Sequence, residues 1–88
     1  MNTFKLIVSS PDGNKFSGEA VKLYLRGTEG EFAIMAGHIP FVTSVVKGNC
    51  IIWTDEDTKK TAVIDGGLLT VNKENATLLS GSFKFIEE

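Results

Sequence analysis

Hydrophobic and polar residues alternate with a period of two over most of the 88-residue chain. In AVKLYLR, residues 20–26, Val21, Leu23 and Leu25 fall on one face and the residues between them fall on the other. This spacing is typical of a strand with one buried face. Further strands are predicted at FKLIV (4–8), FVTSVV (41–46), NCIIWT (49–54) and TAVID (61–65). The last two are short and rich in β-branched residues, so burial on both faces is expected.

Turn-forming residues interrupt this pattern at short intervals. They occur at PDGN (11–14), GTEG (27–30), KGN (47–49), TDEDTKK (54–60), DGG (65–67) and NKEN (72–75). Strands between them have the usual length of about five to seven residues. Two hairpins are expected, one with the charged loop 54–60 and one tight around Asn72 to Asn75. The ending GSFKFIEE (81–88) fits a final edge strand or a frayed tail.

These segments predict an all-β fold. Eight or more short strands joined by tight turns favour two packed, mostly antiparallel sheets, as a sandwich or a flattened barrel. No stretch keeps helical spacing over three turns, so no long amphipathic helix is expected. Residues 1–88 contain no linker or low-complexity tract and are expected to form a single domain. A domain of this size buries roughly 60% of the surface that its unfolded chain exposes, so its core is expected to be thin.

Charge and cysteine content exclude several classes of function. The formal net charge is -2, and the nine Lys and Arg residues are spread along the chain, so no basic patch for nucleic acid is expected. Cys50 is the single cysteine, cannot form an internal disulfide, and is expected to pack in the core. No apolar run approaches the roughly 20 residues that cross a bilayer. Any membrane association is therefore expected to come through a protein partner.

The sequence offers no catalytic, metal or cofactor site. His38 is the only histidine, and no nucleophile-elbow spacing surrounds a nearby serine, so a catalytic triad is not expected. One His and one Cys cannot build a structural zinc site. The acids at 55–57 lack the spacing of a calcium loop and are expected to form a solvated hairpin tip. Gly30 and Gly37 precede no phosphate-binding motif and are interpreted as backbone positions that need positive φ.

The stretch GEFAIMAGHIPF, residues 30–41, remains as the candidate contact region. Glu29 and Glu31 flank Gly30, an apolar run follows, and Pro40 restricts the far end. We expect one stiff, partly apolar loop that serves as a contact surface. From the residues alone, the chain is a β-rich binding module. A free-standing β-sandwich that binds protein or carbohydrate remains an alternative, although Trp53 and Tyr24 supply few aromatic rings for a sugar site.

Two runs carry a resemblance to a known family. They are LRGTEGEFAIMAGHIPFVTSVVKG (25–48) and VIDGGLLTV (63–71), and FKLIVSSPDGNKFSGEAVKLYLRG before them also fits, including Phe16-Ser17-Gly18. They resemble the N-terminal domain of the ε subunit of F-type ATP synthase, with its E-G-E and G-H-x-P block and its later glycine pair. The resemblance covers nearly the whole chain. It implies a flattened β-sandwich of two five-stranded sheets.

The resemblance also implies a function and partners. Such a subunit sits on the central stalk between the γ subunit and the membrane ring of c subunits, and meets the α/β catalytic head only indirectly. It turns with γ, couples proton or sodium-ion flow to ATP synthesis, catalyses nothing and needs no cofactor. Carried over by position, Glu29, Gly30 and Glu31 face the ring, and His38, Ile39 and Thr43 face γ. The expected location is a peripheral membrane complex on the cytoplasmic side of the bacterial membrane.

Several residues depart from the family pattern. Ala36 stands where proline is usual, Ala33 where glycine is usual, Asp65 where serine is usual and Thr70 where glutamate is usual. Family members usually continue for about 40 to 50 residues as a two-helix hairpin that inhibits ATP hydrolysis, and in some members binds ATP. The sequence ends at Glu88, so neither that hairpin nor its inhibition and ATP binding are expected for these residues. A naturally short ε subunit and a chain cut after the β domain both fit, and the initial methionine and the polar ending favour the first.

Overall fold

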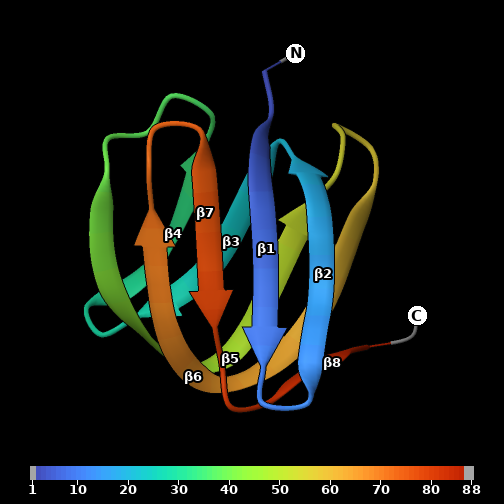
Figure 1. Cartoon of the computed structure of the whole chain (residues 1–88), viewed down its shortest axis with the longest axis vertical. Coiled ribbons are helices and arrows are strands. Elements are labelled where there is room, and N and C mark those ends of the chain that lie inside the picture. Colours follow the sequence, from blue (N-terminus) through green and yellow to red (C-terminus); the bar gives the residue numbers. More distant parts are fainter. Residues whose placement is uncertain (1, 87–88) are drawn as a thin grey trace.

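The computed structural model describes residues 2–86, and these residues form eight β-strands and no helix (Figure 1). Within this part of the chain there is accordingly no helix long and apolar enough to cross a membrane. The predicted all-β fold is confirmed. The strands are β1 (Phe4–Ser10), β2 (Gly13–Ala20), β3 (Lys22–Gly27), β4 (Gly30–Met35), β5 (Phe41–Trp53), β6 (Lys59–Val71), β7 (Asn75–Leu79) and β8 (Phe83–Phe85).

The strands pair in the order β2-β1-β7-β6-β5-β3-β4, and β8 pairs with β6. All neighbours are antiparallel except β1 and β7, which are parallel. The two longest strands, β5 and β6, curve together at one end of the molecule and pass from one layer to the other (Figure 1). One layer contains β2, β1, β7, the end of β6 and the start of β5. The other contains β4, β3, the end of β5, the start of β6 and β8.

Eight strands therefore supply five strand segments to each layer, which is the sandwich that the resemblance implies. The sheet stays open because the order ends at β2 on one side and β4 on the other. The structure is thus a sandwich and not a closed barrel.

The turns predicted at KGN (47–49) and DGG (65–67) are wrong. Both segments lie inside continuous strands, with Val46 opposite Gly66 and Val45 opposite Gly67. The glycines let these strands bend without reversing. At Gly67 the bend brings the backbone of Leu79 so close that a Cβ would lie 2.1 Å from its carbonyl oxygen. The strands predicted on either side of these glycines thus merge into β5 and β6, with Gly48 of β5 opposite Ile64 of β6.

Residues 30–35, expected to be part of a loop, form strand β4. Its apolar residues match those of β3, with Phe32 opposite Leu25 and Ile34 opposite Leu23. Strand β2 was also absent from the prediction because its sequence, GNKFSGEA, is largely polar. The hairpin around loop 54–60 and the tight hairpin closed by the hydrogen bond from Asn72 N–H to Asn75 O (2.7 Å) are confirmed.

The core lies between the layers and contains apolar side chains from every strand of both. Cys50 is fully buried there, as predicted, and burial raises the pKa of its thiol to about 12. Burial of TAVID and NCIIWT on both faces is wrong, because β5 and β6 alternate instead. Val63 is 41% exposed, whereas its neighbours Ala62 and Ile64 are buried. Each layer therefore keeps an outer face that solvent or a partner can reach.

The close approach at Gly67 gives a testable expectation for stability. A methyl group there collides with the backbone of Leu79, which cannot move without separating β6 from β7. We expect Gly67→Ala to lower the free energy of unfolding in urea by about 1–3 kcal/mol or more. Gly18→Ala is the control, because the nearest atom to its Cβ is an ordinary 3.6 Å away. Equal stability of the two variants would contradict the close approach.

Candidate functional site

The predicted contact residues lie at opposite ends of strand β4. The turn with Glu29, Gly30 and Glu31 joins β3 to β4, and the loop with His38 and Ile39 joins β4 to β5 (Figure 1). The expectation of one stiff loop holding both contacts is therefore wrong. The apolar run between them pairs with β3 as a strand, and it separates the two groups by its full length.

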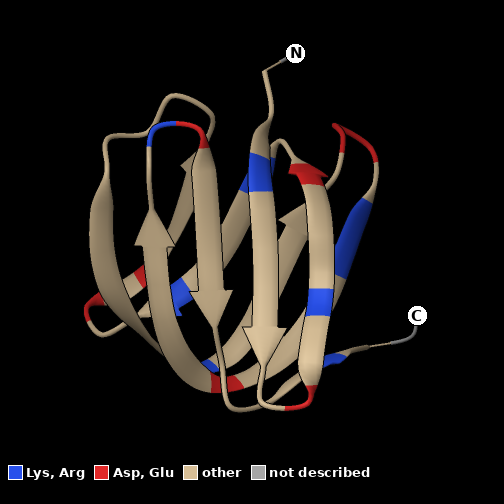
Figure 2. Cartoon of the chain, in the orientation of Figure 1, with Lys and Arg blue, Asp and Glu red and all other residues tan. Residues whose placement is uncertain are grey.

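The acidic turn is a tight and exposed hairpin. Gly27 pairs with Gly30, so Thr28 and Glu29 form the tip. Gly30 has a φ of +127°, a backbone conformation that side-chain-bearing residues rarely adopt. Figure 2 shows the acidic side of this turn projecting from the molecule. Thr43, from β5, lines the same shallow hollow as residues 27–32. The structure thus groups Thr43 with the acidic turn and not with His38.

The two acids of this turn have different surroundings. Arg26 lies opposite Glu31 in the β3–β4 pair, and its Nη2 is 3.4 Å from a Glu31 carboxylate oxygen. The Tyr24 side chain lines the same hollow as Arg26 and Glu31. Its hydroxyl, and then Arg26, hold the pKa of Glu31 below its ordinary value. The same interaction raises the pKa of Tyr24. Among residues 2–86, Glu29 has no hydrogen bond or ion pair, so its carboxylate is the freer of the two.

The loop between β4 and β5 is held by local contacts of His38. Its Nδ1 lies 3.1 Å from the carbonyl oxygen of Ile39, and its ring centroid lies 5.0 Å from that of Phe41. Its backbone N–H donates to Met35 O at 3.3 Å. His38 thus acts as part of the loop's framework. The side chain that this loop presents to solvent is Ile39, which is 74% exposed.

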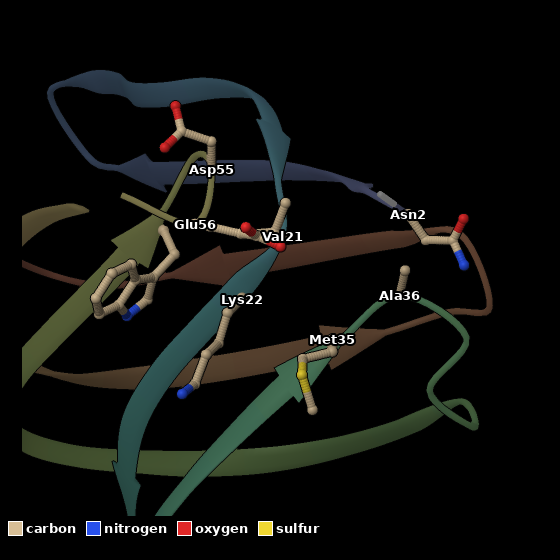
Figure 3. Close-up of a pocket in the computed structure, with 8 residues that line it drawn as sticks. Asn2, Val21, Lys22, Met35, Ala36, Asp55 and Glu56 are labelled. Carbon is tan, nitrogen blue, oxygen red and sulfur yellow. The ribbon is translucent and has the colours of Figure 1, made fainter. Parts of the chain in front are cut away.

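A second hollow lies at this end of the sandwich, beside the start of the loop (Figure 3). Met35, Ala36 and Val21 form its apolar side, and Lys22 reaches toward Trp53, with Nζ 6.0 Å from the ring centroid. Asp55 and Glu56 add acids to the same rim. Charges of both signs therefore meet here, and they select no single class of ligand. Ala36, which replaces the usual proline, packs against the core.

The acids of the loop between β5 and β6 lie in solvent, as predicted. Asp55 accepts a hydrogen bond from the Asp57 N–H at 2.8 Å, and this bond, together with Thr58, lowers the pKa of Asp55. The carboxylate therefore serves to shape the loop. Across residues 2–86 no three His, Cys, Asp or Glu side chains are arranged to hold a metal ion.

The outer face formed by β5, β6 and β7 is free of charge. Its outward residues alternate between hydroxyl and apolar side chains: Val42, Ser44, Leu68, Thr70, Thr77 and Leu79. Val42 is 63% exposed, Leu79 50% and Leu68 42%. The charged residues of these strands lie elsewhere, with Lys47 and Asp65 at the bend of β5 and β6 and with Lys59 and Lys60 at the start of β6 (Figure 2). Exposed apolar side chains gathered on an uncharged sheet face are typical of a protein interface.

Two parts of this arrangement were missed from the sequence. The Tyr24 and Arg26 contacts could have been found, because a hairpin that turns at Gly27 and Gly30 places Arg26 opposite Glu31. The uncharged face could not, because β5, β6 and β7 become neighbours only through a sheet order that the alternation of residues does not reveal.

Comparison with known proteins identifies the family. The model of the family described as "ATP synthase, Delta/Epsilon chain, beta-sandwich domain" matches residues 3–85. The chain belongs to this family. The ATP synthase epsilon chain of Clostridium novyi is 36% identical over 86 residues, which are 98% of this chain and 66% of that one. The present chain thus spans about two thirds of the length of that relative.

Solved structures agree on the fold. A chain from the Euglena gracilis mitochondrial ATP synthase, in a structure that contains OSCP, F1 and the c-ring, has a TM-score of 0.90 with 23% identity. The match covers 98% of this chain and 55% of that one. A chain from the central stalk and c-ring structure of the Tetrahymena thermophila enzyme has a TM-score of 0.78 with 8% identity, over 93% of this chain and 66% of that one. At these identities the likeness concerns the fold alone.

The contact between Tyr24 and Glu31 can be tested by titration. Because the folded chain lowers the pKa of Glu31, the interaction is present above the ordinary value of 4.5 and is lost as the pH falls through the folded pKa. We expect Tyr24→Phe to raise the pKa of Glu31, measured by NMR of its carboxyl carbon. Tyr24 is the only tyrosine, so its phenol can be followed by absorbance, and Glu31→Gln should lower its pKa. Unchanged values in both variants would exclude the contact.

Proposed function

We propose that this chain is a central-stalk subunit of an F-type ATP synthase that links the γ subunit to the membrane ring of c subunits. The observation that carries the proposal is the family match over residues 3–85, and the structure supplies two separate surfaces that suit two partners. The subunit couples ion flow to ATP synthesis mechanically, with no catalytic residue of its own. The family match favours this function over a free-standing module that binds protein or carbohydrate.

The acidic turn is the proposed contact with the ring. Glu29 is exposed at the tip of a tight hairpin, with Gly30 and Glu31 beside it. Negative side chains on a projecting turn favour a partner loop that carries basic residues, and such a contact weakens as salt screens it. Exposed ion pairs contribute little each, so the contact guides and positions the subunit more than it anchors it.

The γ subunit is proposed to cover the uncharged face of β5, β6 and β7 together with the neighbouring residues His38, Ile39 and Thr43. This face offers exposed Val42, Leu68 and Leu79, whose burial supplies the hydrophobic free energy that the acidic turn lacks. Ile39 extends the apolar surface on the loop that leads into β5. Thr43 lies toward the acidic turn, so it is proposed to mark the boundary between the two partners.

A rigid spacer is the proposed mechanical role. Strand β4 has six residues, which span roughly 20 Å, and it connects the acidic turn at one end to the His38 loop at the other. Hydrogen bonds to β3 along its length keep this distance fixed. Rotation of γ is then transmitted to the ring without bending of the sandwich. The proposed location is on the cytoplasmic side of the membrane, held there through the complex.

Charge reversal tests the ring contact. We expect Glu29→Lys combined with Glu31→Lys to reduce proton-driven ATP synthesis in the reassembled enzyme, because like charges then face each other. Glu56→Lys is the control, since this exposed acid lies on the loop at the other end of the sandwich. Binding of the double variant to the ring should weaken further at low salt, because the repulsion is then less screened. Synthesis at the rate of the control would refute the ring contact.

A matched pair of leucine and valine variants tests the γ contact. Leu68 and Val63 lie on the outer faces of opposite layers and are 42% and 41% exposed. We expect Leu68→Asp to reduce binding of the chain to isolated γ by tenfold or more, about the effect of 1.4 kcal/mol, and Val63→Asp to leave binding unchanged. Circular dichroism checks that both variants fold. A larger loss with Val63→Asp would move the γ contact to the other face.

A further inference from the structure

We propose that Arg26 competes inside the chain with the partner's basic groups for Glu31, and so sets how tightly the acidic turn binds the ring. This inference rests on the proposed function, since it concerns the contact between that turn and a basic loop. In this proposal the Glu29 carboxylate is free to bind a partner, whereas the Glu31 carboxylate is already paired with Arg26.

The geometry of the β3–β4 hairpin carries the inference. Arg26 and Glu31 are the cross-strand pair immediately before the closing pair of Gly27 and Gly30, so the arginine lies at the base of the acidic turn. Their nearest side-chain atoms are 3.4 Å apart. Tyr24, two residues before Arg26 on the same face, is a diagonal neighbour of Glu31 and lines the same hollow as both residues. Glu31 is thus held from the side by two groups of β3.

Both partners of this pair are accessible. The side chains of Arg26 and Glu31 are 55% and 50% exposed. An ion pair in such a position exchanges readily, because water solvates each charge when the pair opens. A lysine or arginine of the partner can therefore bind Glu29 without competition. It can bind Glu31 only when Arg26 moves away from that carboxylate. The guanidinium also repels the incoming cation, which adds to the effect.

Arg26 has two effects, competition for Glu31 and repulsion of the partner's cation. Combining Arg26→Gln with Glu31→Gln separates them. We expect Arg26→Gln to tighten binding of the full chain to an isolated complex of γ and the c-ring by about two- to fivefold at low salt, the range that exposed ion pairs produce. The gain should be clearly smaller in the Glu31→Gln background, where only relief of the repulsion by Arg26 remains. Lys22→Gln is the control, because it removes the same charge from the opposite end of the same strand face.

A second measurement uses the chain without partners. Arg26→Gln should raise the pKa of Glu31 measured by NMR, because the guanidinium is one of the groups that lowers it. Circular dichroism confirms that the exposed substitution leaves the fold intact. An unchanged pKa of Glu31, equal binding by Arg26→Gln and the native chain, or an equally large gain in the Glu31→Gln background would each overturn the proposal.

These outcomes are distinct from failure of the proposed function. Loss of binding in the Glu29→Lys and Glu31→Lys double variant, together with no effect of Arg26→Gln, refutes only the competition. Undiminished binding by that double variant refutes the ring contact itself, and the competition with it. Tighter binding by Arg26→Gln, with Lys22→Gln unchanged and a smaller gain without Glu31, supports both.

Discussion

The continuous pairing of β5 with β6 is the interaction on which the other features depend. Twelve residue pairs run from Phe41 opposite Val71 to Trp53 opposite Lys59, and they cross from one layer to the other. Neither layer could keep its place if these strands ended at their glycines, because the two halves would then be separate sheets joined by loops. Gly67 allows the crossing, since it leaves space for the backbone of Leu79 where β7 meets the bend.

The bend also explains why the sequence predicts some elements and misses others. Alternation in Leu23 and Leu25 identifies β3 correctly, because one face of that strand is buried along its whole length. The glycines at 48, 66 and 67 resemble turn signals, and nothing local distinguishes a bent strand from a reversal. Whether a glycine ends a strand depends on which backbone lies against it, and the backbone against Gly67 comes from residue 79. That contact is invisible to any local pattern.

The candidate site also combines features that the sequence predicts with features that only the fold reveals. The acids of the β3–β4 turn are evident in the sequence, and so is the stiffening by Pro40. Their spatial separation is not, because it depends on residues 30–35 forming a strand. Thr43 lines a hollow with the acidic turn because the start of β5 also reaches β3, where Val45 pairs with Gly27. Chemistry that belongs to one residue can be inferred from sequence, whereas the grouping of residues requires the sheet order.

The parallel pair of β1 and β7 has a consequence for the synthesis of the chain. Lys5 pairs with Asn75 and Ser9 with Leu79, so β1 cannot gain this neighbour until about 70 further residues have been made. The hairpin of β1 and β2 can form early, but the layer to which it belongs has no centre until β7 arrives. Such distant pairings slow folding and leave unpaired strand edges exposed in the meantime. The edge of β1 that β7 covers in the folded domain therefore stays unpaired until residues 75–79 have been made.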